Sequence, residues 1–190
     1  MVRYVHKFPE LSFLQRAKNK KIGLFGGSFN PLHEGHWQCA EGLRKAGRLD
    51  QIWWLPTPQN PLKSLDIQQN FQVRAQEVHA RIAHHPKHRL SLLLADPKFY
   101  YTIDFLKFLN TFRSSNQLFW LAGSDILGEL HRWQNWQELP NYCQMLFYSR
   151  PSDGLNRLPV TTRQHLRSFP LVMGKRLKLS SSKIRAIESL

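Results

Sequence analysis

Cysteine, acidic residues and long apolar runs are all scarce in this sequence. The two cysteines, Cys39 and Cys143, do not have the spacing of metal ligands, and both stand in apolar surroundings. We therefore expect two reduced, buried thiols and assign neither of them a function. No apolar stretch approaches the roughly 20 residues that a membrane helix requires, and the first 21 residues lack the apolar middle of a signal peptide. We expect a soluble, cytoplasmic protein that does not interact with membranes.

Acidic residues are outnumbered, with 13 Asp and Glu against 27 Lys and Arg and a net charge of +14. The surplus is concentrated at the two ends of the chain. Residues 1–21 carry six basic and one acidic side chain, and residues 150–190 carry nine and two. A nucleic-acid-binding protein usually spreads a basic stripe over its folded body. The distribution fits small polyanionic substrates as well, and a solvated basic surface accounts for part of it. We do not expect nucleic acid as a partner.

Short apolar runs alternate with helical patterns along the chain. Near-continuous hydrophobicity in such runs implies strands that are buried on both faces. Apolar residues at helical spacing mark two intervening helices, around residues 71–82 and 105–112. This alternation predicts an α/β fold, a Rossmann-like open parallel sheet with helices on both faces. We expect residues 1–20 to form a basic N-terminal extension and residues 21–190 a single domain. The predicted strands are Ile22 to Phe25, Ile52 to Leu55, Leu90 to Ala95, Leu118 to Ala122, Gln144 to Tyr148 and Leu171 to Met173.

A segment rich in glycine and histidine leaves the first predicted strand and enters a predicted helix that ends at Gly47. Two glycines after a strand let the backbone approach a phosphate closely. Both histidines of the segment fall at or just before the helix N-terminus, where the helix dipole and the imidazole donors can converge on one anion. The segment therefore predicts a site for the phosphates of a nucleotide. It reads Gly26-Gly27-Ser28-Phe29-Asn30-Pro31-Leu32-His33-Glu34-Gly35-His36.

This segment resembles the nucleotide-binding motif of the HxGH nucleotidylyltransferases. Within that superfamily the chain is similar to the bacterial nicotinate-nucleotide adenylyltransferases, and the resemblance spans roughly residues 20–187. A second motif near the C-terminus, Ser180-Ser181-Ser182-Lys183-Ile184-Arg185, is similar to the S-S-T-x-I-R motif of that group. Further landmarks match in the expected order: Asn60-Pro61-Leu62-Lys63, Tyr101-Thr102-Ile103-Asp104, Gly123-Ser124-Asp125, Trp133 and Arg150-Pro151.

The resemblance implies transfer of AMP from ATP to nicotinate mononucleotide, which gives deamido-NAD and pyrophosphate for NAD biosynthesis. Because the phosphate of the acceptor attacks directly, no side-chain nucleophile is needed, and catalysis consists of alignment and charge stabilisation. No cluster of carboxylates suggests a metal site built by the protein alone. We therefore expect Mg²⁺ to arrive with ATP, bound mainly to phosphates and water.

Four side chains are the candidates for catalysis: His33, His36, Lys63 and Arg185. By resemblance, His36 contacts the reacting phosphate, His33 helps to orient ATP, and the amides of the glycine loop hold its phosphates. Histidine suits this position because it can donate a proton at neutral pH. The predicted ATP-binding residues are Gly26, Gly27, Ser28, Phe29, His33, His36, Gly123, Asp125, Ser181, Ser182 and Arg185.

The second motif is physically a serine-capped helix N-terminus followed by a guanidinium, and such an end binds phosphate readily. A serine cap without a ligand is the plain alternative. Lys63 follows Leu62, where many relatives have a histidine, so this loop lacks one phosphate donor. Lys63 and Arg74 remain to bind anions there, unless Lys63 is simply a solvated lysine.

The resemblance places the pyridine ring of the acceptor against Trp133 and its carboxylate on Thr102 and on the backbone amide of Gln134. Trp136, three residues later on nearly the same predicted helical face, is a rival for stacking, and either tryptophan could belong to the core. Asp125 is expected to accept a hydrogen bond from a ribose hydroxyl, with a helix N-cap as its alternative. The predicted substrate-binding residues are Asn30, Lys63, Arg74, Thr102, Trp133 and Gln134.

Two other functions stay open at this point. An adenylyltransferase of the same fold could act on nicotinamide mononucleotide or on phosphopantetheine instead. A non-catalytic, basic nucleic-acid-binding module is the alternative of another class, and it predicts salt-sensitive binding without pyrophosphate release. The sequence also leaves open whether the chain forms a homo-oligomer.

Overall fold

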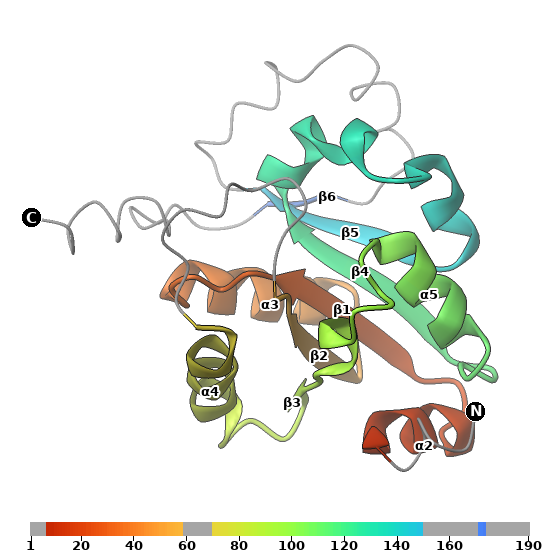
Figure 1. Ribbon diagram of the computed structural model, residues 1–190, viewed down its shortest axis with the longest axis horizontal. Helices are drawn as coiled ribbons and strands as arrows, with labels where there is room; N and C mark the ends of the chain where they lie inside the picture. Colours follow the sequence, from red (N-terminus) through yellow and green to blue (C-terminus); the bar gives the residue numbers. More distant parts are fainter. Residues whose placement is uncertain (1–6, 59–69, 150–170, 174–190) are drawn as a thin grey trace, which may run out of the picture.

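A parallel β-sheet forms the centre of the computed structural model, which describes residues 7–58, 70–149 and 171–173. Its strand order is β3-β2-β1-β4-β5-β6, and every neighbouring pair is parallel (Figure 1). The direction of winding reverses between β1 and β4, and in open α/β sheets ligands bind at such a point, in the crevice at the carboxyl ends of the strands. The strands are β1 (Lys21–Gly27), β2 (Gln51–Pro56), β3 (His88–Leu90), β4 (Gln117–Gly123), β5 (Gln144–Ser149) and β6 (Leu171–Met173).

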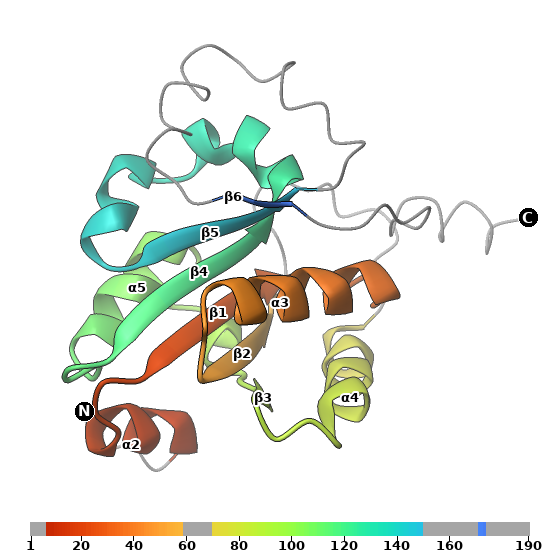
Figure 2. The same cartoon turned by 180° about the vertical axis from the view of Figure 1, so that it is seen from behind.

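Helices cover both faces of the sheet, as Figures 1 and 2 show from opposite sides. One face packs against α3 (Glu34–Ala46) and α4 (Phe71–Ile82), and the other against α2 (Pro9–Arg16) and α5 (Thr102–Asn110). The two cores are separate because successive side chains of a strand point to opposite faces. Trp53 and Trp54, both fully buried, belong to different cores for this reason. The predicted Rossmann-like α/β fold is confirmed. Four short 3₁₀ helices complete the described part: η1 (Leu93–Ala95), η2 (Ser124–Gly128), η3 (Leu130–Arg132) and η4 (Trp136–Asn141).

The predicted strand Leu90 to Ala95 is wrong. Strand β3 ends at Leu90, and η1 begins three residues later. The amide of Ser91 still donates to the carbonyl of Trp54 at 2.9 Å, but the Ser91 hydroxyl then accepts from the amide of Leu93 at 3.3 Å. This turn sends Leu93 and Leu94 into the core on the α2 and α5 side, so their hydrophobicity reflects a buried turn and not a strand.

Part of the predicted N-terminal extension packs against the domain. Phe8, Leu11 and Leu14 are at most 7% exposed and belong to the core that α5 covers. The side-chain amide of Asn116 donates to the carbonyls of Leu14 at 2.8 Å and Ala17 at 2.9 Å. Its oxygen also accepts from the amide of Lys20 at 2.9 Å. Three apolar residues of the extension therefore belong to the domain's core.

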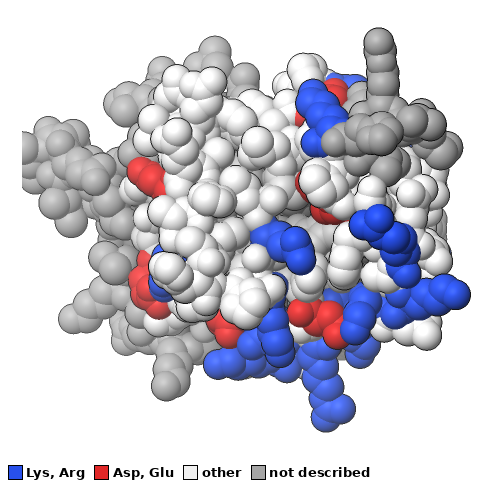
Figure 3. Space-filling model, turned by 90° about the horizontal axis from the view of Figure 1, so that it is seen from below, with Lys and Arg blue, Asp and Glu red and all other residues white. Residues whose placement is uncertain are grey.

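Basic side chains gather at the amino ends of the strands. The carbonyl of Lys20 accepts from the first residue of β4, and that of Lys87 accepts from the amide of Ile52 in β2, which places both lysines at this edge. Lys18, Lys20 and Lys87 are exposed there. Figure 3 shows the Lys and Arg side chains concentrated over this side of the molecule, around α2 and the starts of the strands. The described part of this surplus lies at the edge opposite the carboxyl ends of β1 and β4, whereas most of the basic residues between 150 and 190 lie outside the described ranges.

No helix within the described ranges is long and apolar enough to cross a lipid bilayer. Both thiols are buried, as predicted.

Candidate functional site

Two predicted nucleotide-binding segments lie next to each other at the crevice. The parallel register pairs Phe25 of β1 with Leu121 of β4. Two residues later, β1 ends at Gly27 and β4 ends at Gly123. The glycine-rich loop and the segment from Gly123 to Asp125 therefore leave the same edge of the sheet from adjacent strands. Ligands bind at this place in open α/β sheets.

His33 and His36 form a stacked pair at the start of α3. His33 is the N-cap residue, and its backbone amide donates to Nδ1 of His36 at 3.2 Å. The ring centroids are 3.8 Å apart, with an interplanar angle of 23°. Because Nδ1 of His36 accepts, the neutral imidazole carries its proton on Nε2 and can donate from that atom. The structure thus joins the two histidines at a helix N-terminus, where a negative charge is stabilised.

The buried ring of Phe29 packs against the ring of His36. The Phe29 side chain is 1% exposed, and the ring lies edge-on to His36 with centroids 5.2 Å apart. The same ring contacts Phe25 at 5.5 Å and Trp54 at 5.3 Å. Only the backbone of Phe29 is therefore left for the predicted contact with ATP, while its side chain fixes His36 to the core.

The glycines of the site differ in how closely other side chains approach them. A Cβ on Gly26 would lie 2.7 Å from the ring of Trp120, and one on Gly27 would lie 3.0 Å from the ring of Phe29. A Cβ on Gly123 would lie 2.3 Å from the carboxylate of Asp125, an exposed residue. The Asp125 side chain thus lies over Gly123 at the carboxyl end of β4, and its predicted contact with a ribose stays a prediction.

Arg74 is buried against the loops that follow β1 and β2, and it is not exposed at their surface. We expected it to bind an anionic substrate, but it is 1% exposed. Its Nη1 donates to the carbonyls of Ser28 and, at 2.9 Å, Thr57, and its Nη2 donates to the carbonyl of Pro58 at 3.0 Å. Burial lowers the pKa of the guanidinium, although arginine starts so high that it stays charged. These contacts make Arg74 part of the loop structure.

The other described residues that were predicted to bind the acceptor stand on three segments: the loop after β1, the start of α5 and the segment after β4. Trp133 is half-buried and lies edge-on to Trp120, with ring centroids 6.1 Å apart. Trp133 follows η3 and Trp136 opens η4, with Asn135 at a φ of 48° between them. The expectation that the two tryptophans share one helical face is therefore wrong, because the helix is interrupted there. Thr102 is the first residue of α5, Gln134 is exposed, and Asn30 is buried.

Lys63, Ser181, Ser182 and Arg185 lie outside the described residues, and so do the motifs around Asn60 and Arg150. Their roles stay predictions.

A buried histidine, which the sequence did not single out, connects α3 to the edge of the sheet. His88 of β3 accepts at Nδ1 from the indole of Trp54 at 2.9 Å, so its Nε2 donates to Glu41 of α3 at 2.8 Å. Glu41 also accepts from Arg44 at 2.6 Å, and mainly for that reason its pKa falls to about 2. Burial lowers the pKa of His88. Only the Glu41 and Arg44 pair, three residues apart on a helix, was detectable in the sequence.

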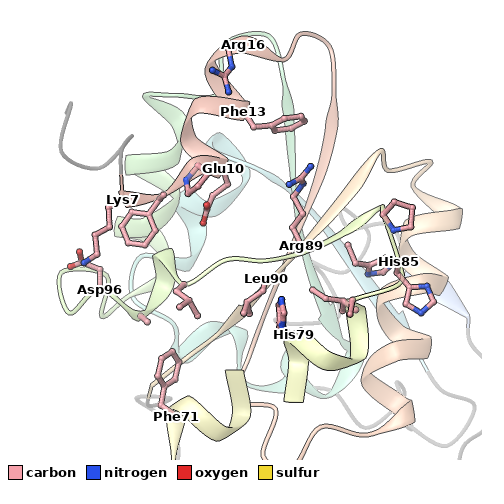
Figure 4. A pocket seen from close by; sticks show the side chains of 18 of the residues that line it. Lys7, Glu10, Phe13, Arg16, Phe71, His79, His85, Arg89, Leu90 and Asp96 are labelled. Atoms are coloured by element: carbon pink, nitrogen blue, oxygen red, sulfur yellow. The ribbon is translucent and has the colours of Figure 1, made fainter. Parts of the chain in front are cut away.

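An open groove of about 1160 Å³ lies elsewhere, between α2, the end of α4 and β3 (Figure 4). Its walls carry Lys7, Arg16 and Arg89 together with Glu10 and Asp96. None of the predicted site residues that the structure describes lines this groove. We therefore place the candidate site at the crevice and not in the groove.

Comparison with known proteins identifies the family of this chain. The model of the cytidylyltransferase-like family matches residues 24–187, a stretch that includes both motifs. The chain belongs to the cytidylyltransferase-like family. The resemblance inferred from the sequence motifs is thereby confirmed.

Relatives within the cytidylyltransferase-like family carry a specific name. A probable nicotinate-nucleotide adenylyltransferase of Mesorhizobium japonicum is 33% identical over 88% of this chain and 95% of its own length. The same named protein of Brucella suis biovar 1 is 31% identical over the same shares. Among solved structures, Plasmodium falciparum nicotinic acid mononucleotide adenylyltransferase complexed with NaAD matches with a TM-score of 0.70 and 20% identity. The match covers 88% of this chain and 83% of the Plasmodium falciparum chain, and it shows that the two proteins share a fold.

Proposed function

We propose that this protein is a nicotinate-nucleotide adenylyltransferase, which transfers AMP from ATP to nicotinate mononucleotide in NAD biosynthesis. The observation that carries the proposal is the stacked pair His33 and His36, fixed at the N-terminus of α3 beside a glycine loop at the crevice. The relatives of Mesorhizobium japonicum and Brucella suis, which are named for this activity, match over 88% of the chain. Among the described residues, the basic surplus at the opposite sheet edge offers no comparable site.

In the proposed reaction, a phosphate oxygen of nicotinate mononucleotide attacks the α-phosphorus of ATP. A new P–O bond forms, the bond from the α-phosphorus to the bridging oxygen breaks, and pyrophosphate leaves with the electron pair. Negative charge grows on the phosphate oxygens along this path. His36, donating from Nε2, stabilises that charge, and His33 orients ATP. Lys63, Ser181, Ser182 and Arg185 complete the set of phosphate donors.

The remaining predicted residues select the two substrates. Asp125 accepts from a ribose hydroxyl of ATP, and its position over Gly123 at the crevice supports this role. Trp133 stacks on the pyridine ring, while Thr102 and the amide of Gln134 bind its carboxylate.

Magnesium enters this proposal as part of the MgATP substrate. The described residues contain no group of three His, Cys, Asp or Glu side chains that could hold a metal ion. In this proposal phosphates and water are the main ligands of the ion, which would neutralise charge on the triphosphate.

A panel of acceptors tests the proposed specificity. Purified protein is offered ATP and Mg²⁺ with nicotinate mononucleotide, nicotinamide mononucleotide or phosphopantetheine, and pyrophosphate release is measured. We expect the highest kcat/KM with nicotinate mononucleotide. Preference for another acceptor would overturn the specificity and keep the reaction type. Salt-sensitive oligonucleotide binding without pyrophosphate release from any acceptor would favour the nucleic-acid-binding alternative.

His36→Ala tests the transition-state role. Removing one donor to the developing charge lowers kcat by about 10² to 10³, whereas KM for ATP changes only a few-fold. Steady-state kinetics at saturating acceptor measure both parameters. The matched control is His84→Ala, an exposed histidine after α4, which we expect to leave both unchanged. Equal effects of His36→Ala on kcat and on ATP affinity would contradict the assignment.

A further inference from the structure

We propose that Arg74 is a positioning residue of the phosphate site, which holds together the loops after β1 and β2 and thereby fixes the backbone that carries the glycine amides and the histidine pair. This inference rests on the proposed function and goes beyond it, because Arg74 touches neither substrate in this assignment.

The guanidinium of Arg74 joins two loops that are distant in the sequence. Ser28, in the glycine-rich loop, is 46 residues away, and Thr57 and Pro58, directly after β2, are 17 and 16 residues away. The amide of Thr57 also donates to the carbonyl of Gly27 at 2.9 Å, so the two loops contact each other where the guanidinium links them.

Arg74 itself stands on a fixed element. It lies in the first turn of α4, whose N-cap Asn70 accepts from the amide of Gln72 at 2.8 Å. The ring of Phe71 lies 5.6 Å from the guanidinium carbon. With 1% of the residue exposed, the side chain has little freedom to move. The helix thus presents its guanidinium to the loops in a defined orientation.

The hydrogen bond at Ser28 is connected to the histidine pair through the next residue in the chain. The next residue, Phe29, has a φ of 47°, in the left-handed region, and its buried ring supports His36. A shift of the Ser28 carbonyl would therefore move the backbone at Phe29 and tilt the His36 ring. Because catalysis by charge stabilisation depends on donor position, a displacement of about 1 Å costs rate more than affinity.

Arginine is specifically suited to this arrangement. Its planar fork donates in several fixed directions, so one side chain can satisfy three carbonyl oxygens on two loops. A lysine keeps the charge but offers a single compact ammonium group, which cannot bridge the same oxygens. The three hydrogen bonds are partly buried, and losing one of them costs about 0.5–1.5 kcal/mol.

The central test uses Arg74→Lys and Arg74→Gln, compared with wild type at a temperature well below each Tm. We expect folded proteins whose kcat is at least 30-fold lower, with KM for ATP and for nicotinate mononucleotide within threefold. In Arg74→Ala, millimolar methylguanidinium restores kcat at least threefold. The matched control is Arg16→Met, an exposed arginine in the last turn of α2, which leaves kcat unchanged.

A second readout is independent of activity. Hydrogen exchange of the backbone amides at Gly27, Phe29 and Thr57 should be at least tenfold faster in Arg74→Lys, with β4 and α5 unchanged. If the wild-type protein releases no pyrophosphate with any acceptor, the proposed function fails, and hydrogen exchange still decides whether Arg74 holds the loops.

Several results would overturn the inference. Wild-type kcat in the folded Lys and Gln variants would show that the bridge does not matter. A raised KM for one substrate with unchanged kcat would make Arg74 a substrate contact. If neither variant folds, or if exchange rises uniformly over the whole chain, Arg74 stabilises the fold and does not position the site.

Discussion

Gly26 and Gly123 lack a side chain for different physical reasons, and the reasons predict different phenotypes. In Gly26→Ala, the new Cβ meets the ring of Trp120, which is 3% exposed and has no room to withdraw. We expect a loss of about 1–3 kcal/mol in the free energy of unfolding, measured with urea. Unchanged stability would show that Trp120 can repack.

Gly123→Ala provides the contrast. Its new Cβ meets only the end of the exposed Asp125 side chain, which can move away, and the φ of −72° suits alanine. The free energy of unfolding should change by less than about 0.5 kcal/mol. If Asp125 binds the ribose, KM for ATP rises several-fold, because the carboxylate is displaced. An unaltered KM would argue against that role.

Residues also differ in how readily the sequence predicted them. His33 and His36 lie in one contiguous segment, so their joint position at a helix N-terminus could be inferred from spacing alone. Arg74 reaches partners 16 to 46 residues away, and no local pattern indicates that its guanidinium points into the protein. The spacing of Trp133 and Trp136 suggested one helical face. The positive φ of Asn135 interrupts the helix between them, and no pattern in the sequence predicts that backbone conformation.

At the scale of elements, His88 and Glu41 couple α3 to the sheet edge and make stability depend on pH. Both groups have a lower pKa in the folded protein than in the unfolded chain. As pH falls, the unfolded chain therefore takes up protons first, and stability is lost. The loss begins near pH 6.5 through His88 and continues from about 4.5 towards 2 through Glu41.

Urea unfolding between pH 8 and pH 4 measures this dependence. We expect the free energy of unfolding to decrease steadily below pH 6.5 and the decrease to be smaller in His88→Gln. A His88→Gln variant with the same pH profile as wild type would show that other groups carry the effect.

Helix α2 is attached to the domain by burial and by side-chain hydrogen bonds, among them those of Asn116 and the one from the Ser91 hydroxyl to Glu10. Asn116→Ala removes the hydrogen bonds to Leu14, Ala17 and Lys20, and we expect a loss of about 2–3 kcal/mol in stability. Proteolysis near α2 should become faster. Because α2 is remote from the crevice, kcat of the folded variant stays within twofold of wild type. A large fall in kcat without destabilisation would contradict this account.

The sequence predicted most elements because apolar runs and buried strands coincide. It failed at Leu90 to Ala95, since a run of apolar residues does not distinguish a strand from a turn whose side chains are buried. Residues 1–20 were grouped as an extension by their charge, and that grouping did not indicate that Phe8, Leu11 and Leu14 belong to the core.

At the scale of the whole molecule, the basic edge and the crevice are separated by the length of the strands. The seven residues of β1 span roughly 20 Å at about 3.3 Å per residue. This separation exceeds the Debye length of about 8 Å at physiological ionic strength, so exposed charges at one edge hardly influence the other.

Charge reversal tests this separation. We expect Lys18→Glu combined with Lys87→Glu to leave KM for ATP within twofold at 0.15 M salt, as measured by initial rates. A tenfold increase in KM would show that the basic edge attracts the substrate.

The placement of the two cysteines has a practical consequence. Cys39, on the buried side of α3, belongs to the core on one face of the sheet, and Cys143 belongs to the core on the opposite face, where burial raises the pKa of its thiol to about 12. A thiol-reactive dye modifies only thiolates that become accessible, so each side of the sheet contains its own reporter of transient opening. Labelling rates of single-cysteine variants would show whether the cores on the two faces of the sheet open together or independently.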